Sequence, residues 1–104
     1  MAIYMTARWQ CRLGAEETVE EALRQFVASV KENEPHTHLY TALQHEADPT
    51  RFMTYFIFED EAAQTFHRST DWVKRFTEVI YPENVEPVVF TEYRLVASTA
   101  GEKG

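Results

Sequence analysis

Residues Arg51 to Glu59 constrain the fold more than any other segment of this chain. Two alternating sets of residues make up the segment, and both are largely apolar: Phe52, Thr54, Phe56 and Phe58 in one set, Met53, Tyr55 and Ile57 in the other. Successive side chains of a strand point to opposite faces of a sheet. The segment therefore predicts a central strand whose two faces are both buried.

The rest of the chain supplies partners for that strand. Alternation with a period of two predicts further strands over Ile3–Arg12, His36–Glu46 and Pro87–Ala97. Apolar residues at helical spacing predict helices over Glu16–Asn33 and Asp60–Arg68, and a third helix that starts around Ser69-Thr70-Asp71 and stops at Pro82. The order β-α-β-β-α-α-β is typical of an α+β, ferredoxin-like split β-α-β fold with a four-stranded antiparallel sheet. We expect this domain to cover residues 1–97, followed by a flexible tail over 98–104.

Helices on one side of such a sheet leave its second apolar face without a cover. Large exposed apolar patches are rare on monomeric proteins. A second copy of the same sheet is the simplest cover, because closed twofold dimers are the commonest oligomers. We therefore predict a homodimer that pairs through its sheet faces, a dimeric α+β barrel that encloses a pocket.

Charge and cysteine content exclude several classes of partner. The net charge of −7 disfavours binding to nucleic acid or to anionic lipid. Cys11 is the single cysteine, so no internal disulfide forms, which fits a reducing compartment. The first residues lack the basic and apolar run of a signal peptide, and no stretch approaches the roughly 18 apolar residues of a transmembrane helix. These features predict a cytoplasmic protein with no nucleic-acid or membrane partner.

A series of short motifs carries a resemblance to a known family. The motifs are Ala7-Arg8-Trp9, Asn33-Glu34-Pro35, Asp48-Pro49-Thr50-Arg51-Phe52, Phe58-Glu59-Asp60-Glu61-Ala62-Ala63, His67-Arg68-Ser69 and the closing stretch from Val85 to Val96. Their order and spacing over residues 3 to 97 resemble the antibiotic biosynthesis monooxygenase (ABM) domain family, a branch of the dimeric α+β barrel superfamily. No single motif is a signature, and together they are more specific for the fold than for one activity.

The resemblance implies a dimer of ferredoxin-like subunits and an oxygenase that uses no flavin, haem or metal. Such an enzyme oxidises a quinol or an aromatic phenol with O2 in a pocket between sheet and helices, and the deprotonated substrate itself supplies the electrons. The family also contains members without proven catalysis. A non-catalytic ligand-binding or interaction domain on the same dimeric fold is therefore the alternative hypothesis.

Some positions depart from the family pattern. His36 follows the proline where the family often has Gly, and Phe56 and Phe58 stand where Glu and Trp are common. These changes make the expected pocket more apolar and remove a carboxylate that could accept a proton. Haem-degrading relatives use an Asn, a Trp and a His, whereas the matching positions here hold Ala7, His67 and Thr77, which argues against haem degradation.

His67 is the candidate catalytic residue. It matches a recurrent histidine of the family, and a histidine titrates near neutral pH, so it could accept a phenol proton or hydrogen-bond a quinone oxygen. A structural histidine that ties two helices together is the alternative. The candidate substrate-binding residues are mostly aromatic, as a flat apolar ligand requires: Tyr4, Arg8, Tyr40, Phe56, Phe58 and Trp72.

Each of these residues also has a simpler structural interpretation. Aromatic side chains often serve only as core, and Arg8 is more simply paired with Glu92 on the last strand than with an anionic substrate oxygen. The His36-x-His38 pair lacks an evident third ligand, so we predict no metal site and no cofactor. Cys11 belongs to the apolar set of its strand and is expected in the core.

Overall fold

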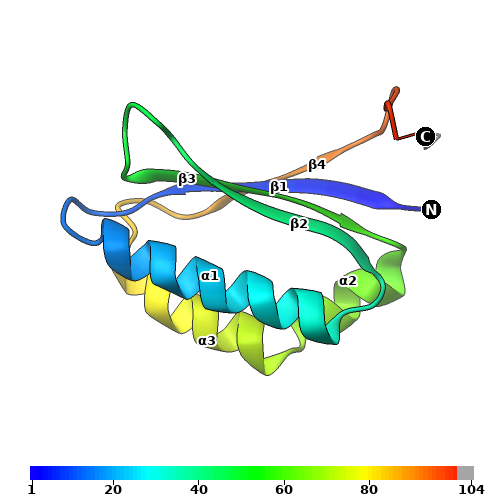
Figure 1. The fold of residues 1–104 in the computed structure, drawn as a ribbon, viewed down its shortest axis with the longest axis horizontal. Coiled ribbons are helices and arrows are strands. Elements are labelled where there is room, and N and C mark those ends of the chain that lie inside the picture. Colours follow the sequence, from blue (N-terminus) through cyan, green and yellow to red (C-terminus); the bar gives the residue numbers. More distant parts are fainter. Residues whose placement is uncertain (101–104) are drawn as a thin grey trace.

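The computed structural model, described over residues 1–100, places three helices against one face of a sheet (Figure 1). The elements in chain order are β1 (Ile3–Gln10), α1 (Glu16–Asn33), β2 (Thr37–Gln44), β3 (Arg51–Phe58), α2 (Glu61–Arg68), α3 (Asp71–Ile80), the short 3-10 helix η1 (Tyr81–Glu83) and β4 (Val89–Tyr93). This order confirms the predicted α+β, ferredoxin-like fold. The domain limits of 1–97 and 98–104 remain a prediction, and residues 101–104 of the expected tail lie outside the described part.

The sheet is antiparallel throughout and has the strand order β2-β3-β1-β4. The strand that the sequence marked as central, β3, lies between β1 and β2. Its register sets Thr54 opposite Ala7 on β1 and opposite Ala42 on β2. A register shift between Thr37 and Leu39 interrupts β2, which a simple alternation does not reveal.

The predicted bounds of the helices agree better with the structure than those of the strands do. The first helix spans Glu16–Asn33 as predicted, and Pro35 follows its end. The predicted last strand was too long, because the structure pairs only Val89–Tyr93 with β1 and leaves 94–97 outside the sheet. Cys11, placed at the end of the first strand, makes an isolated bridge to Asn84 and is buried in the core as expected.

The helix-facing side of the sheet forms the core. Alternate residues of β1 and β3 point into it and are buried or packed against it: Ile3, Met5, Ala7 and Trp9, and Phe52, Thr54, Phe56 and Phe58. Helices α1 and α3 lie side by side beneath the sheet (Figure 1), and the rings of Phe26 and Phe76 stack between them with centroids 4.4 Å apart. Phe66 of α2 and Val79 of α3 are apolar but lie outside the core and are exposed.

Two side chains cap the N-termini of α2 and α3. Asp60 accepts a hydrogen bond from the backbone N–H of Ala63 at 2.9 Å, and Thr70 accepts one from Val73 at 3.3 Å. Both are N-cap contacts that satisfy otherwise unpaired donors of the first turn. The Thr70 hydroxyl also donates to the carbonyl of His67 at 2.9 Å, which fixes the corner between α2 and α3.

The other side of the sheet has no helix over it (Figure 1). We call it the open face, and its residues alternate with the core set: Tyr4, Thr6, Arg8, Gln10, Leu39, Thr41, Leu43, Arg51, Met53, Tyr55, Ile57, Val89, Thr91 and Tyr93. Arg8 and Arg51 are the charged residues of this set, and Leu43, Val89 and Tyr93 are each at least half exposed. Across residues 1–100 no helix is both long enough and apolar enough to cross a bilayer.

Candidate functional site

A cavity of about 510 Å³ lies between the sheet and the helices. This volume falls within the range of roughly 300–1,000 Å³ that is typical of small-molecule sites. Aromatic rings form much of its wall, contributed by strands and helices alike: Trp9, Phe26, Tyr40, Phe56, Phe58, Phe76, Tyr81 and Phe90. His67, from the last turn of α2, also lines the cavity.

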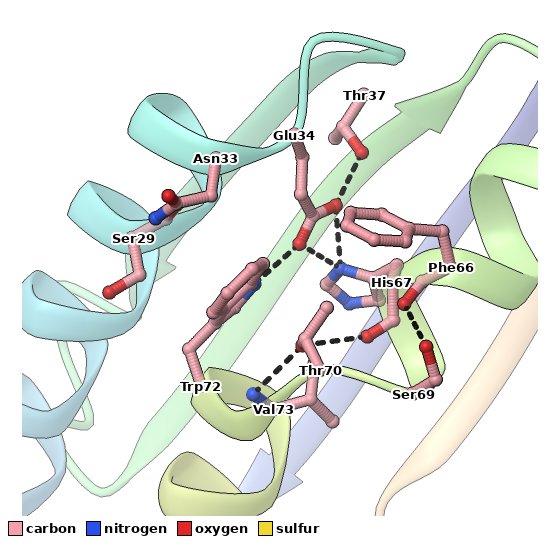
Figure 2. Close-up of polar contacts among 10 residues, drawn as sticks. All are labelled: Ser29, Asn33, Glu34, Thr37, Phe66, His67, Ser69, Thr70, Trp72 and Val73. Atoms are coloured by element: carbon pink, nitrogen blue, oxygen red, sulfur yellow. Dashed lines mark hydrogen bonds and ion pairs between the residues drawn. The ribbon is translucent and has the colours of Figure 1, made fainter.

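A buried carboxylate holds His67 in place. Nδ1 of His67 lies 2.9 Å from Oε2 and 3.0 Å from Oε1 of Glu34, the residue that ends α1. The same carboxylate accepts the indole N–H of Trp72 at 2.6 Å and the hydroxyl of Thr37 at 2.6 Å (Figure 2). Three elements and a strand end therefore meet at one carboxylate, whose side chain is only 1% exposed.

The ionisation of Glu34 follows from these contacts. Burial alone would raise the pKa of its carboxyl group, since it removes water from the charged form. Hydrogen bonds from His67, Thr37 and Trp72 outweigh that effect and hold the pKa below its ordinary value. Glu34 is thus a buried anion at neutral pH, stabilised by donors from three neighbouring segments.

The carboxylate also fixes the tautomer of His67. An ionised carboxylate only accepts hydrogen bonds, so Nδ1 must carry the hydrogen that it shares with Glu34. In the neutral ring, Nε2 then holds the free lone pair. Within residues 1–100 no protein group makes a hydrogen bond to Nε2. The arrangement leaves one nitrogen available to a ligand in the cavity.

Aromatic rings pack closely around this histidine. The ring centroids of Phe58, Tyr40 and Phe26 lie 5.1, 5.5 and 5.8 Å from that of His67. Burial raises the pKa of Tyr40 well above its ordinary value, and the neighbouring Thr54 hydroxyl offsets this only in part. Tyr40 therefore stays a neutral phenol, and His67 is the group among these that offers a free lone pair to a ligand proton.

Some of the predicted site residues meet in this cavity and others do not. Tyr40, Phe56 and Phe58 line it together with His67. Tyr4 and Arg8 lie on the open face, so the sheet separates them from any ligand in the cavity. The suggested pairing of Arg8 with Glu92 is wrong, because the register sets Glu92 opposite Met5 and Arg8 opposite Val89.

Trp72 takes a different position from the one predicted. Its ring does not line the cavity, and its indole N–H donates to Glu34, the same carboxylate that contacts His67 (Figure 2). Trp72 therefore acts on the histidine indirectly, by holding the Glu34 carboxylate that orients it. The sequence pattern indicates no role for Glu34 in the site, although Glu34 stands directly before the proline that follows an amphipathic helix. A glutamate at such a helix end can indicate a buried carboxylate, but its partner His67 is 33 residues away in the sequence and cannot be identified from it.

Two exposed histidines, one just before β2 and one within it, face a single carboxylate. His36 Nδ1 and His38 Nε2 lie 3.3 and 3.4 Å from the two oxygens of Glu59, and all three side chains are partly solvated. In the described part of the chain, no group of three or more His, Cys, Asp or Glu residues could hold a metal ion. These contacts are surface ion pairs when the histidines are protonated.

Comparison with known proteins places the chain in a family. The family model described as antibiotic biosynthesis monooxygenase matches residues 2–79. The chain belongs to the ABM family. No curated protein matches it.

Solved structures share the ABM fold at low sequence identity. A crystal structure of an antibiotic biosynthesis monooxygenase has a TM-score of 0.84 and 21% identity, over 93% of this chain and all (100%) of that one. A protein from Pseudomonas aeruginosa has a TM-score of 0.83 and 23% identity, over 92% and 95% of the two chains. Protein Rv0793 from Mycobacterium tuberculosis has a TM-score of 0.85 and 13% identity, over 95% and 99%. At these identities the likeness supports the fold alone.

Proposed function

We propose that this ABM-family protein is a cofactor-independent monooxygenase that oxidises a quinol or an aromatic phenol with O2 in the cavity between sheet and helices. The observation that carries the proposal is the Glu34–His67 pair at the wall of an aromatic cavity. The pair provides an oriented base, and the rings provide a flat apolar slot. Family membership supports the reaction class.

The chain's own residues would act on the substrate proton. Nε2 of His67 accepts the proton of the substrate hydroxyl, which leaves an electron-rich phenolate. The imidazolium that results faces the Glu34 carboxylate at 2.9–3.0 Å, which stabilises its positive charge. The walls around it exclude water and hold the ring by stacking.

The reaction balances without a separate reductant. A quinol and O2 give a hydroxyquinone and water. One oxygen atom enters a ring C–H bond, and the other leaves as water together with the two hydroxyl hydrogens. The four electrons that reduce O2 all come from the substrate.

Oxygen consumption tests the proposal. Purified protein is incubated with a panel of quinols and anthrones while O2 is followed with an electrode, and His67→Asn is run beside the wild type. We expect uptake above the autoxidation rate for at least one compound, and loss of that excess in the variant. Uptake equal to the autoxidation background across the whole panel would refute the activity.

A non-catalytic ligand-binding domain is the second candidate, favoured by one specific observation. Phe56 and Phe58 both line the cavity at positions where the family commonly carries a Glu and a Trp, so the walls near His67 hold few polar groups. A ligand that raises the melting temperature and is recovered unchanged in air would support this candidate. Mass action sets the size of that shift from the ligand's affinity.

We further propose that two copies pair through their open faces. The charges on this face are two arginines, Arg8 and Arg51, on a chain whose net charge is −7. Its Leu43, Val89 and Tyr93 side chains stay at least half exposed in a single copy. Burying such a surface removes apolar area from water at roughly 25 cal/mol per Å². Sedimentation velocity at micromolar concentration tests the pairing, and a stable monomer would contradict it.

A further inference from the structure

Two residues of the cavity wall, Trp9 and Thr54, carry buried polar groups without a hydrogen-bond partner in residues 1–100. The indole Nε1 of Trp9 and the hydroxyl of Thr54 are buried, and neither makes a hydrogen bond to any group in residues 1–100. The Thr54 hydroxyl lies toward the Tyr40 phenol but not at hydrogen-bonding geometry. Both residues line the cavity, at 6% and 1% exposure. Buried polar groups are normally hydrogen-bonded, so each such exception requires an explanation.

The second tryptophan of the chain shows what a satisfied indole looks like here. The N–H of Trp72 donates to the Glu34 carboxylate at 2.6 Å (Figure 2). Trp9 is packed just as closely, with its ring stacked on Phe52 at 5.7 Å and edge-on to Phe76 at 6.1 Å, yet its N–H lacks an acceptor. A weak contact with the Phe76 ring would be the sole protein alternative.

We infer that Trp9 and Thr54 form a second polar subsite, which binds an oxygen atom of an elongated aromatic ligand whose other oxygen meets His67. This inference rests on the proposed function for the identity of the first subsite. An indole N–H can only donate, so the ligand must present an acceptor such as a carbonyl or phenolic oxygen. The Thr54 hydroxyl can donate or accept and therefore suits a phenol as well.

The sheet sets the length of the ligand. The His67 ring packs on Phe56 as well as on Phe58. Trp9 pairs with Phe52, which lies four residues before Phe56 on the same strand, and four residues of a strand span about 13 Å. Thr54 lies between Phe52 and Phe56. A single ring cannot reach both ends, whereas three fused rings with an oxygen at each end can.

Two anthraquinones isolate this subsite from catalysis. 2,6-Dihydroxyanthraquinone has a hydroxyl at each end, 2-hydroxyanthraquinone has one, and both are already oxidised at the central ring. Titration calorimetry measures the ratio of their dissociation constants. We expect the wild type to bind the dihydroxy compound about tenfold more tightly, as one extra hydrogen bond to a buried donor predicts.

Three variants assign the preference to its residues. Trp9→Phe removes the indole N–H but keeps a flat ring, and Thr54→Val removes the hydroxyl at nearly constant shape. Each should reduce the ratio to below about threefold while binding of 2-hydroxyanthraquinone changes little. Thr6→Val is the matched control, because the Thr6 hydroxyl is also buried without a partner in the described residues but lies on the open face. It should keep the wild-type ratio.

The outcomes separate this inference from the proposed function. A wild-type ratio near one, an unchanged ratio in both cavity variants, or no binding of either compound would overturn the second subsite. Absence of O2 uptake with the preference intact would refute the proposed reaction and leave the subsite standing. If Trp9→Phe does not fold, Thr54→Val alone decides the question.

Discussion

Replacing Glu34 by Gln tests the buried carboxylate on which the site depends. The change keeps the size of the side chain and removes its charge. Glu34 now accepts from three donors, His67, Trp72 and Thr37. A glutamine offers one accepting oxygen and an amino group that can only donate. At least one of the three donors would then face another donor in a space that is almost free of solvent.

The structure sets the size of the effect. A hydrogen bond to a charged group contributes about 1.5–3 kcal/mol, and a buried donor left without a partner costs about 1–3 kcal/mol. Relaxation of the flanking residues recovers part of this loss. We therefore expect Glu34→Gln to lower the free energy of unfolding by about 2–4 kcal/mol. For a domain of this size, each kcal/mol corresponds to roughly 4–8 °C in melting temperature.

The pH dependence gives a second signature of the same group. The folded-state pKa of Glu34 is depressed, so its stabilising contribution is present above the ordinary value of 4.5 and is lost as the pH falls through the folded pKa. The wild type should lose this contribution in acid. Glu34→Gln should lack that part of the loss, and its stability deficit should therefore shrink below pH 4.5.

Urea titrations followed by tryptophan fluorescence at several pH values measure both signatures. Glu59→Gln is the matched control, because Glu59 also faces histidines but its side chain is 47% exposed. It should change stability by less than about 0.5 kcal/mol. The interpretation of Glu34 as an ionised buried acceptor is refuted if the two variants lose the same stability, or if the Glu34→Gln deficit does not depend on pH.

Three further perturbations test other parts of the account. His67→Asn should reduce O2 uptake with a responsive quinol by at least about 100-fold, the usual range for loss of a general base, and an unchanged rate would remove His67 from the chemistry. Gly14→Ala should lower the free energy of unfolding by about 1–2 kcal/mol in a urea titration, because Gly14 has a φ of +98°. A Cβ there would meet no atom within 4 Å, so the loss would come from the backbone conformation alone, and no loss would show that the turn relaxes freely. Tyr55→Glu, in the middle of the open face, should shift the sedimentation coefficient from dimer to monomer, and a persistent dimer would place the interface elsewhere.

The fold could be predicted from the sequence because its signals are local. Alternation fixed which residues of β3 share a face, and apolar spacing with Pro35 fixed the extent of α1. The end of β4 could not be predicted in this way. Alternation continues past Tyr93, but the sheet pairs that strand with β1 only up to Tyr4.

The site was less predictable, because it depends on how strands pair. Parity within a strand says which side chains lie together, but not which face meets which face of the next strand. Tyr4 and Arg8 were therefore grouped with Phe56 and Phe58, although the register places them on opposite sides of the sheet. Trp9, which shares their strand, lines the cavity instead.

The contacts of Glu34 are remote in sequence and were missed for that reason. Its bonds to His67 and Trp72 bridge 33 and 38 residues, and no local pattern encodes such a distance. In the sequence, the motif Asn33-Glu34-Pro35 contributes to the family resemblance and marks the end of a helix, but it does not indicate a bond to His67. Geometry in three dimensions shows that the carboxylate of this motif orients the histidine.

A crystal structure with bound 2,6-dihydroxyanthraquinone tests most directly whether the cavity lined by His67 is the functional site. We expect the three rings to lie between sheet and helices, with one hydroxyl at hydrogen-bond distance from Nε2 of His67. The opposite hydroxyl should lie beside Trp9 and Thr54. A ligand seated on the open face, or one in the cavity that leaves Nε2 of His67 without a contact, would contradict the account.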